Sequence, residues 1–142
     1  MMKYTIFDCE STGLNLRFDH PLTIAFQTFD QDFNLIDQLS IGTRLRPGVI
    51  PSAFALGTNK LMIEDLRKTN LSFFEMTQEI FRYLEKHTPS FVFGFNSLFF
   101  DEELLRSAFY QNLLPCYLTQ TLGNQRGDVL LMSRAASVFS PW

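Results

Sequence analysis

The stretch Phe7-Asp8-Cys9-Glu10-Ser11-Thr12-Gly13-Leu14 decides how this sequence is interpreted. It overlaps a short apolar run over residues 3–8, which we predict to be a β-strand that ends in an acid. Because alternate residues of a strand point to the same face, Asp8 and Glu10 are expected to lie side by side. Two carboxylates so placed repel each other unless a divalent cation lies between them. Gly13 then allows the backbone to turn sharply and to approach a ligand closely.

A second acidic segment, Gly94-Phe95-Asn96-Ser97-Leu98-Phe99-Phe100-Asp101-Glu102-Glu103, follows another short strand predicted over residues 91–95. Asn96 or Ser97 is predicted to cap the helix that follows, which places Asp101 in the first helical turn. In an α/β sheet, the end of this strand can lie near the end of the first strand. Asp101 would then add a third carboxylate to the same metal site.

The remaining pattern predicts one mixed α/β unit. An antiparallel start is followed by strand–helix units, so we expect a mixed sheet flanked by helices. The other predicted elements are strands over residues 22–29 and 33–41 with a turn at 30–32, a helix from the capping box Ser72-Phe73-Phe74-Glu75 to Pro89, and a final helix over 128–138 capped by Asp128.

Composition excludes several classes of protein. A chain of 142 residues with 46% hydrophobic and 19% charged residues is expected to form one packed domain. A net charge of −3 argues against a basic surface as the main means of binding nucleic acid. Two cysteines are too few for a disulfide scaffold, so a reduced, cytoplasmic setting is expected. No apolar run suits a signal peptide or a membrane span.

The two acidic segments together resemble the first two motifs of the DEDD 3′–5′ exonucleases, Asp-x-Glu-x-Thr-Gly and Asn-x-x-x-Phe-Asp. The branch of bacterial exodeoxyribonuclease I is the better match, because residues 94–103 are similar to its Gly-Tyr-Asn-x-x-Arg-Phe-Asp-Asp-Glu. Either motif alone would be weak evidence, and the two together are strong. Weaker similarity is found at Asp19-His20-Pro21, Asp32-Phe33-Asn34, Phe109-Tyr110-Gln111-Asn112 and from Asp128 through Arg134-Ala135.

The resemblance implies an RNase H-like α/β domain that uses two Mg²⁺ ions, with Mn²⁺ as a substitute. It implies that Asp8 bridges both metals, that Glu10 binds one, and that Asp101 assists the second. The implied substrate is single-stranded DNA, degraded from its 3′ end to mononucleotides. The residues implied to contact the DNA are Thr12 and Gly13 through backbone or hydroxyl groups, Leu14 against the terminal base, and Asn96 and Phe100 along the path of the strand.

The final motif of the family, His-x-x-x-x-Asp, has no counterpart in this sequence. In the family this Asp is the fourth acid and the His is the general base. Here His20 is followed five residues later by Ala25, and His87 by Val92. We therefore expect the single domain over residues 1–142 to be a truncated, incomplete exonuclease domain. General-base help alone supplies ~10²–10⁴-fold in rate, so little or no nuclease activity is expected.

Other interpretations stay open at this point. Asp8 and Glu10 are also compatible with solvated acids at a strand end, and the acids at 101–103 with a helix dipole. The chain would then be a non-catalytic remnant that binds metal or single-stranded DNA weakly. The motif is also similar to the Asp-x-Asp-x-Thr loop of haloacid-dehalogenase-type phosphatases, which normally have Asp where Glu10 stands. A truncated domain would leave one sheet face partly uncovered, which predicts self-association.

Overall fold

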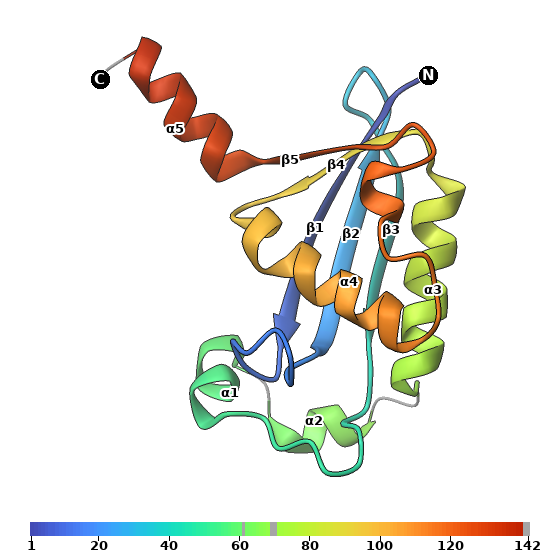
Figure 1. The fold of residues 1–142 in the computed structure, drawn as a ribbon, viewed down its shortest axis with the longest axis vertical. Coiled ribbons are helices and arrows are strands. Elements are labelled where there is room, and N and C mark those ends of the chain that lie inside the picture. The colour runs from blue at the N-terminus through green and yellow to red at the C-terminus, as the bar shows by residue number, and fades with distance from the viewer. Residues whose placement is uncertain (61, 69–70, 141–142) are drawn as a thin grey trace.

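The computed structural model describes residues 1–60, 62–68 and 71–140 (Figure 1). Its centre is a five-stranded sheet with the strand order β3-β2-β1-β4-β5. The strands are β1 (Lys3–Ser11), β2 (Pro21–Phe29), β3 (Leu35–Gly42), β4 (Ser90–Gly94) and β5 (Gln125–Asp128). The helices are α1 (Ala53–Asn59), α2 (Ile63–Lys68), α3 (Phe73–Lys86), α4 (Asp101–Gln111) and α5 (Val129–Phe139), with 3₁₀ turns η1 (Ser97–Phe99) and η2 (Leu118–Gln120).

The predicted mixed sheet is confirmed. β1 pairs antiparallel with β2, and β2 antiparallel with β3, whereas β1–β4 and β4–β5 are parallel pairs. The sequence pattern missed β5, because Gln125-Arg126-Gly127-Asp128 has no apolar alternation. This strand exists through its backbone pairing with β4, which local propensity does not report.

The hydrophobic core lies between one face of the sheet and helices α3 and α4. The capping box predicted for α3 is confirmed, since the Ser72 Oγ accepts from the Glu75 N–H at 3.2 Å and the Glu75 Oε2 accepts from the Ser72 N–H at 2.7 Å. The core includes Phe7, Ile24 and Phe26 from the strands, Met76 and Ile80 from α3, and Leu104, Leu105 and Phe109 from α4. Burial of these apolar side chains is the main stabilising term of the fold.

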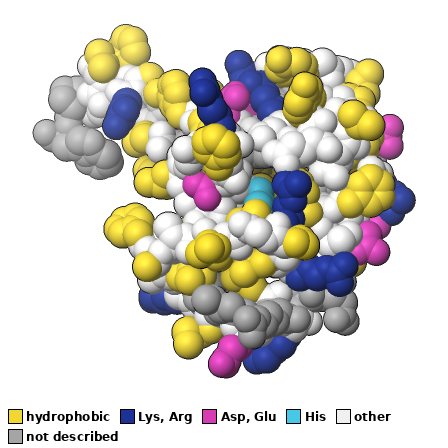
Figure 2. Space-filling model, turned by 60° about the horizontal axis from the view of Figure 1, so that its bottom comes forward, with side chains coloured by type: hydrophobic (Ala, Val, Ile, Leu, Met, Phe, Trp, Pro, Cys, Tyr) yellow, Lys and Arg dark blue, Asp and Glu magenta, His cyan; other side chains and the backbone are white. Residues whose placement is uncertain are grey.

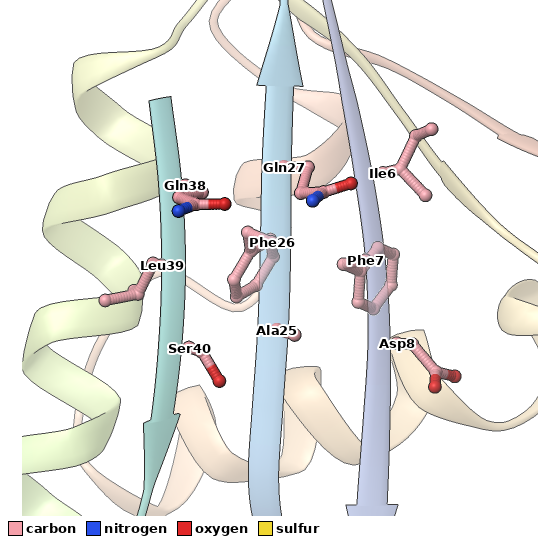
Figure 3. A pocket seen from close by; sticks show the side chains of 9 residues that line it. All are labelled: Ile6, Phe7, Asp8, Ala25, Phe26, Gln27, Gln38, Leu39 and Ser40. Atoms are coloured by element: carbon pink, nitrogen blue, oxygen red, sulfur yellow. The ribbon is translucent and has the colours of Figure 1, made fainter. Parts of the chain in front are cut away.

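The opposite face of the sheet carries exposed side chains. A hollow of about 400 Å³ lies over this face (Figure 3). Ile6 is 39% exposed, and Ala25, Gln27 and Gln38 are exposed on the neighbouring strands. Helix α5 projects away from the sheet (Figure 1) and has no buried residue. Both features leave apolar surface in contact with solvent.

Two details of the predicted elements are corrected. Neither Asn96 nor Ser97 caps α4, because a 3₁₀ turn intervenes and the helix begins only at Asp101 without a side-chain cap. β3 begins at Leu35 instead of Phe33, because Phe33 has a left-handed backbone with φ of 61°. Within the described residues, no helix is long and apolar enough to cross a membrane.

Candidate metal and nucleic-acid site

Strand β1 places the first two acids on the uncovered side of the sheet. Asp8 is exposed and Glu10 is partly buried, whereas Cys9 between them is only 9% exposed and belongs to the core. Asp8 lies on β1 two residues beyond Ile6, and both line the hollow over the open face (Figure 3). The alternation of a strand therefore separates the two carboxylates from the thiol that lies between them in sequence.

The third acid, Asp101, is held against β1 although it lies 92 residues from Cys9 in sequence. It is the first residue of α4 and is 7% exposed. The Cys9 thiol donates a hydrogen bond to the Asp101 Oδ1 at 3.0 Å. The parallel pairing of β1 with β4 makes this approach possible, because it brings the turn after β4 to the carboxyl-terminal half of β1.

The three carboxylates influence one another electrostatically. Burial raises the pKa of Glu10, and the charges of Asp8 and Asp101 raise it further. Burial also raises the pKa of Asp101, with a smaller contribution from Asp8, against the opposing effect of the Cys9 hydrogen bond. Burial and the charge of Asp101 raise the pKa of the Cys9 thiol well above its usual value, so it stays a protonated donor.

Oxygen donors of this kind suit a hard divalent cation such as Mg²⁺. In the described part of the chain, however, no three His, Cys, Asp or Glu side chains are already grouped as a metal site. The fit to a cation rests instead on two other properties of Asp8, Glu10 and Asp101. Their oxygen donors suit a hard cation, and a bound cation would relieve their mutual repulsion.

The turn after β1 is built differently from what the sequence indicated. Thr12 is fully buried, and its hydroxyl donates to the Asp19 Oδ1 at 2.6 Å. The Thr12 hydroxyl is thus used inside the turn, and the expectation that Thr12 and Gly13 contact a nucleotide through backbone or hydroxyl groups stays a prediction. Gly13 is required for space, since a Cβ there would lie 2.5 Å from the Asp19 Oδ2.

A cavity of about 100 Å³ lies beside Glu10. Three of the five residues expected to contact DNA line it, namely Gly13, Leu14 and Phe100. Helix α1, which the sequence pattern did not predict, adds Phe54 and Thr58 to the same lining. The sequence feature that could have indicated α1 is Ser52, because serine is a favoured helix N-cap. In the structure its side chain caps α1 by accepting from the Ala55 N–H at 3.0 Å.

Asn96, the fifth of these residues, is exposed on the turn after β4 and does not line this cavity. Its backbone is left-handed with φ of 56°. The carboxylate of Asp128 holds the turn by accepting from the N–H groups of Asn96 at 2.9 Å and Leu98 at 3.2 Å. Asp128 also caps α5, as predicted, by accepting from the Leu130 N–H at 2.9 Å. Its bonds to the turn were not predicted.

The two histidines are both engaged elsewhere. His20 is 2% exposed, and its Nδ1 lies 3.0 Å from the Pro21 carbonyl oxygen. Burial lowers the pKa of His20. The His87 Nε2 lies 2.7 Å from the Asp37 Oδ2, on the side of the sheet where α3 ends. Within the described structure, neither imidazole contacts Asp8, Glu10 or Asp101, so neither is placed to act as a base there.

The chain is similar in sequence to the exodeoxyribonuclease I of several bacteria. No family model matches the chain. The exodeoxyribonuclease I of Haemophilus influenzae is 27% identical over 140 residues, which are 97% of this chain and 29% of that protein. The exodeoxyribonuclease I of Buchnera aphidicola subsp. Baizongia pistaciae is 26% identical over 142 residues, or 99% of this chain and 29% of that protein.

Solved structures of Escherichia coli exonuclease I have the same fold. The complex with a dT13 oligonucleotide superposes with a TM-score of 0.92 at 22% identity, covering 99% of this chain and 31% of that chain. A zinc-bound complex with single-stranded DNA gives the same TM-score. The expected mixed sheet flanked by helices is therefore confirmed, and it is the fold of the matched part of exonuclease I. The chain resembles exodeoxyribonuclease I along nearly all its residues and spans less than a third of the length of these relatives.

Proposed function

We propose that residues 1–142 form part of a 3′–5′ exonuclease that hydrolyses single-stranded DNA with divalent cations. The observation that carries this proposal is the approach of Asp101 to the strand that bears Asp8 and Glu10, although the two segments lie far apart in sequence. The likeness to exodeoxyribonuclease I supports it, since the sequence similarity covers 97% of this chain and the E. coli exonuclease I structure has the same fold.

The three acids would each have a distinct task. Asp8 and Glu10 would bind the cation from β1, and Asp101, fixed at the start of α4 by the Cys9 thiol, would act on it from the neighbouring element. A bound Mg²⁺ or Mn²⁺ would supply activation of the attacking water and stabilisation of the departing 3′ oxygen. Leu14 and Phe100 would pack on the terminal base, since both line the cavity beside Glu10.

We further propose that the fourth acid and the general base lie outside these 142 residues. The two histidines of the sequence are buried and paired elsewhere, as described above. The chain would thus be one part of an exonuclease domain, and the polypeptide alone would hydrolyse DNA slowly.

A nuclease assay tests this function. The purified 142-residue chain, given 5′-labelled single-stranded DNA and Mg²⁺ or Mn²⁺, should shorten it from the 3′ end about 10²–10⁴-fold more slowly than H. influenzae exodeoxyribonuclease I, because it lacks a general base. The variant Asp8→Ala should be inactive. Hydrolysis of small phosphomonoesters without any of DNA would contradict the proposal and favour a phosphatase of the haloacid-dehalogenase type.

We also propose that copies of the chain associate through their uncovered surfaces. Helix α5 exposes Met132, Val138 and Phe139, and the open sheet face exposes Ile6. A second copy would cover this apolar surface, which gives association at micromolar concentrations. Sedimentation velocity should show dimers or larger species, and Phe139→Glu should shift them toward monomer. The control Leu113→Glu changes an equally exposed apolar residue elsewhere, and a monomeric wild type would contradict the proposal.

A further inference from the structure

A second hollow, of about 510 Å³, lies between the loop after β3 and the start of α3. Its lining contains no carboxylate and combines two guanidinium groups with two aromatic rings. The lining residues are Arg44, Leu45, Arg46, Pro47, Ser72, Phe73 and Phe74. We call it the arginine groove. Figure 2 shows hydrophobic side chains interleaved with Lys and Arg over the end of the molecule that α1, α2 and the adjoining loops form.

Arg46 is held in place although it is exposed. Its guanidinium carbon lies 4.9 Å from the centroid of the Phe73 ring, and its Nη1 donates to the Gln111 Oε1 at 2.6 Å. A guanidinium has five N–H donors in one plane, so most of them stay available to a ligand. The planar fork matches the oxygens of a phosphate, and prior positioning reduces the entropy lost when the ligand binds.

Arg44 supplies a second positive charge to the groove. Its backbone N–H donates to the Leu71 carbonyl at 3.0 Å, which fixes the loop, and its side chain has no hydrogen-bond or ion-pair partner among the described residues. The Ser72 N–H, which donates to the Glu75 carboxylate at 2.7 Å, lowers the pKa of Glu75, and the charge of Arg44 lowers it a little further. Two guanidinium groups and no carboxylate line the groove, so it keeps a local excess of positive charge in a protein whose net charge is −3.

Phe74 gives the groove an aromatic surface. It is 55% exposed, whereas its neighbour Phe73 is buried under Arg46. A single exposed phenylalanine is unremarkable by itself. Flanked by two arginines in a hollow, it matches the arrangement that single-stranded nucleic acids favour, in which cations follow the backbone and aromatic rings stack on bases.

We propose that the arginine groove binds single-stranded nucleic acid, with Arg44 and Arg46 on consecutive phosphates and Phe74 stacked on a base. The same loop continues to Ser52, which lines the cavity beside Glu10. The groove thus binds the strand upstream of a 3′ end that lies in that cavity. Only this polarity rests on the proposed function, because binding in the groove needs neither a cation nor hydrolysis.

The test measures the binding of a fluorescent oligothymidylate in EDTA over a range of salt concentrations. Arg44→Gln and Arg46→Gln should each weaken binding and reduce the slope of log K against log salt by about 0.7, the value for one phosphate contact on a single strand. Phe74→Ala should weaken binding roughly 5- to 150-fold without changing the slope, since it removes one stacked base.

The matched control is Arg82→Gln, an exposed arginine on α3 that pairs with Glu79 outside the groove. It should change neither affinity nor slope, and each variant is checked for an unchanged unfolding temperature. Unaltered binding by the Arg44→Gln, Arg46→Gln double variant would overturn the proposal, as would the absence of binding by the wild type. An abasic strand has no base to stack on Phe74. If Phe74→Ala weakens the binding of an abasic strand as much as that of the oligothymidylate, the stacking contact is overturned.

The outcomes also separate this inference from the proposed function. Binding that depends on Arg44 and Arg46, in a chain whose cation binding does not depend on Asp8, would support the groove and contradict the cation site of the proposed function. Hydrolysis that depends on Asp8, together with DNA binding that is unchanged when both arginines are replaced, would support the exonuclease and contradict the groove.

Discussion

Replacing Asp8 with asparagine is expected to weaken divalent-cation binding strongly and, in the absence of cations, to raise the unfolding temperature. Asp8 is exposed, so the isosteric amide costs no core packing. Its charge raises the pKa of both Glu10 and Asp101, which shows that the three acids repel one another in the folded state. The amide removes this repulsion and also removes a strong oxygen ligand for a cation.

Calorimetry and thermal unfolding measure both effects. The wild type should gain stability as Mg²⁺ or Mn²⁺ is added, because a ligand that binds only the folded state stabilises it. Asp8→Asn should lose affinity for the cation by more than about 100-fold, since replacing residues outside the ligand shell already costs 10- to 100-fold. The control Asp32→Asn makes the same charge change on the exposed β2–β3 turn and should bind cations normally. A cation-dependent gain of the same size in Asp8→Asn would contradict the site.

The pH dependence of stability has a defined sign. Because the pKa values of Glu10 and Asp101 are raised above 4.5 and 3.8, the folded state holds these protons more tightly than the unfolded chain. Their contribution to stability is therefore present in acid and is lost as the pH rises from near 4 through the raised values. In Asp8→Asn this loss should be smaller, because one source of the repulsion is absent.

Glu102→Ala is expected to destabilise the fold by about 3–5 kcal/mol, the usual cost of removing one partner of a buried ionic network. Glu102 is 2% exposed. Its carboxylate accepts from the Arg106 Nη2 at 3.0 Å, from the Arg126 Nη1 at 3.3 Å and from the Thr119 hydroxyl. These contacts connect α4 to β5 and η2, so alanine would leave the buried Thr119 hydroxyl without its acceptor and would remove a buried anion from between the Arg106 and Arg126 guanidinium groups.

The neighbouring Glu103 provides the control for this prediction. Its side chain is 42% exposed and pairs with the same Arg106 at 2.6 Å. Because water screens an exposed ion pair, Glu103→Ala should cost no more than about 1 kcal/mol. Urea unfolding monitored by circular dichroism measures both variants. Equal losses would mean that burial of Glu102 contributes nothing beyond an ordinary surface pair.

Local chemistry was sufficient to predict much of the fold. The β-branched and aromatic content of β2, the capping box at Ser72 and the cap at Asp128 depend only on local sequence, and the structure confirms all three predicted features. The same-face placement of Asp8 and Glu10 also follows from the period of a strand. The predicted cap of α4 was wrong, because the turn before it is held by Asp128, which lies 32 residues away from Asn96.

What the sequence by itself determined is therefore the order of β1, β2, β3, α3, β4, α4 and α5, and the face on which the first two acids lie. Only the tertiary structure decided that Cys9 orients Asp101, that Thr12 bonds to Asp19, and that the arginine groove exists. The physical reason is the range of the interactions involved. Periodicity and capping act within a few residues, whereas hydrogen bonds, burial and cavities between elements depend on contacts that form only when distant segments pack together.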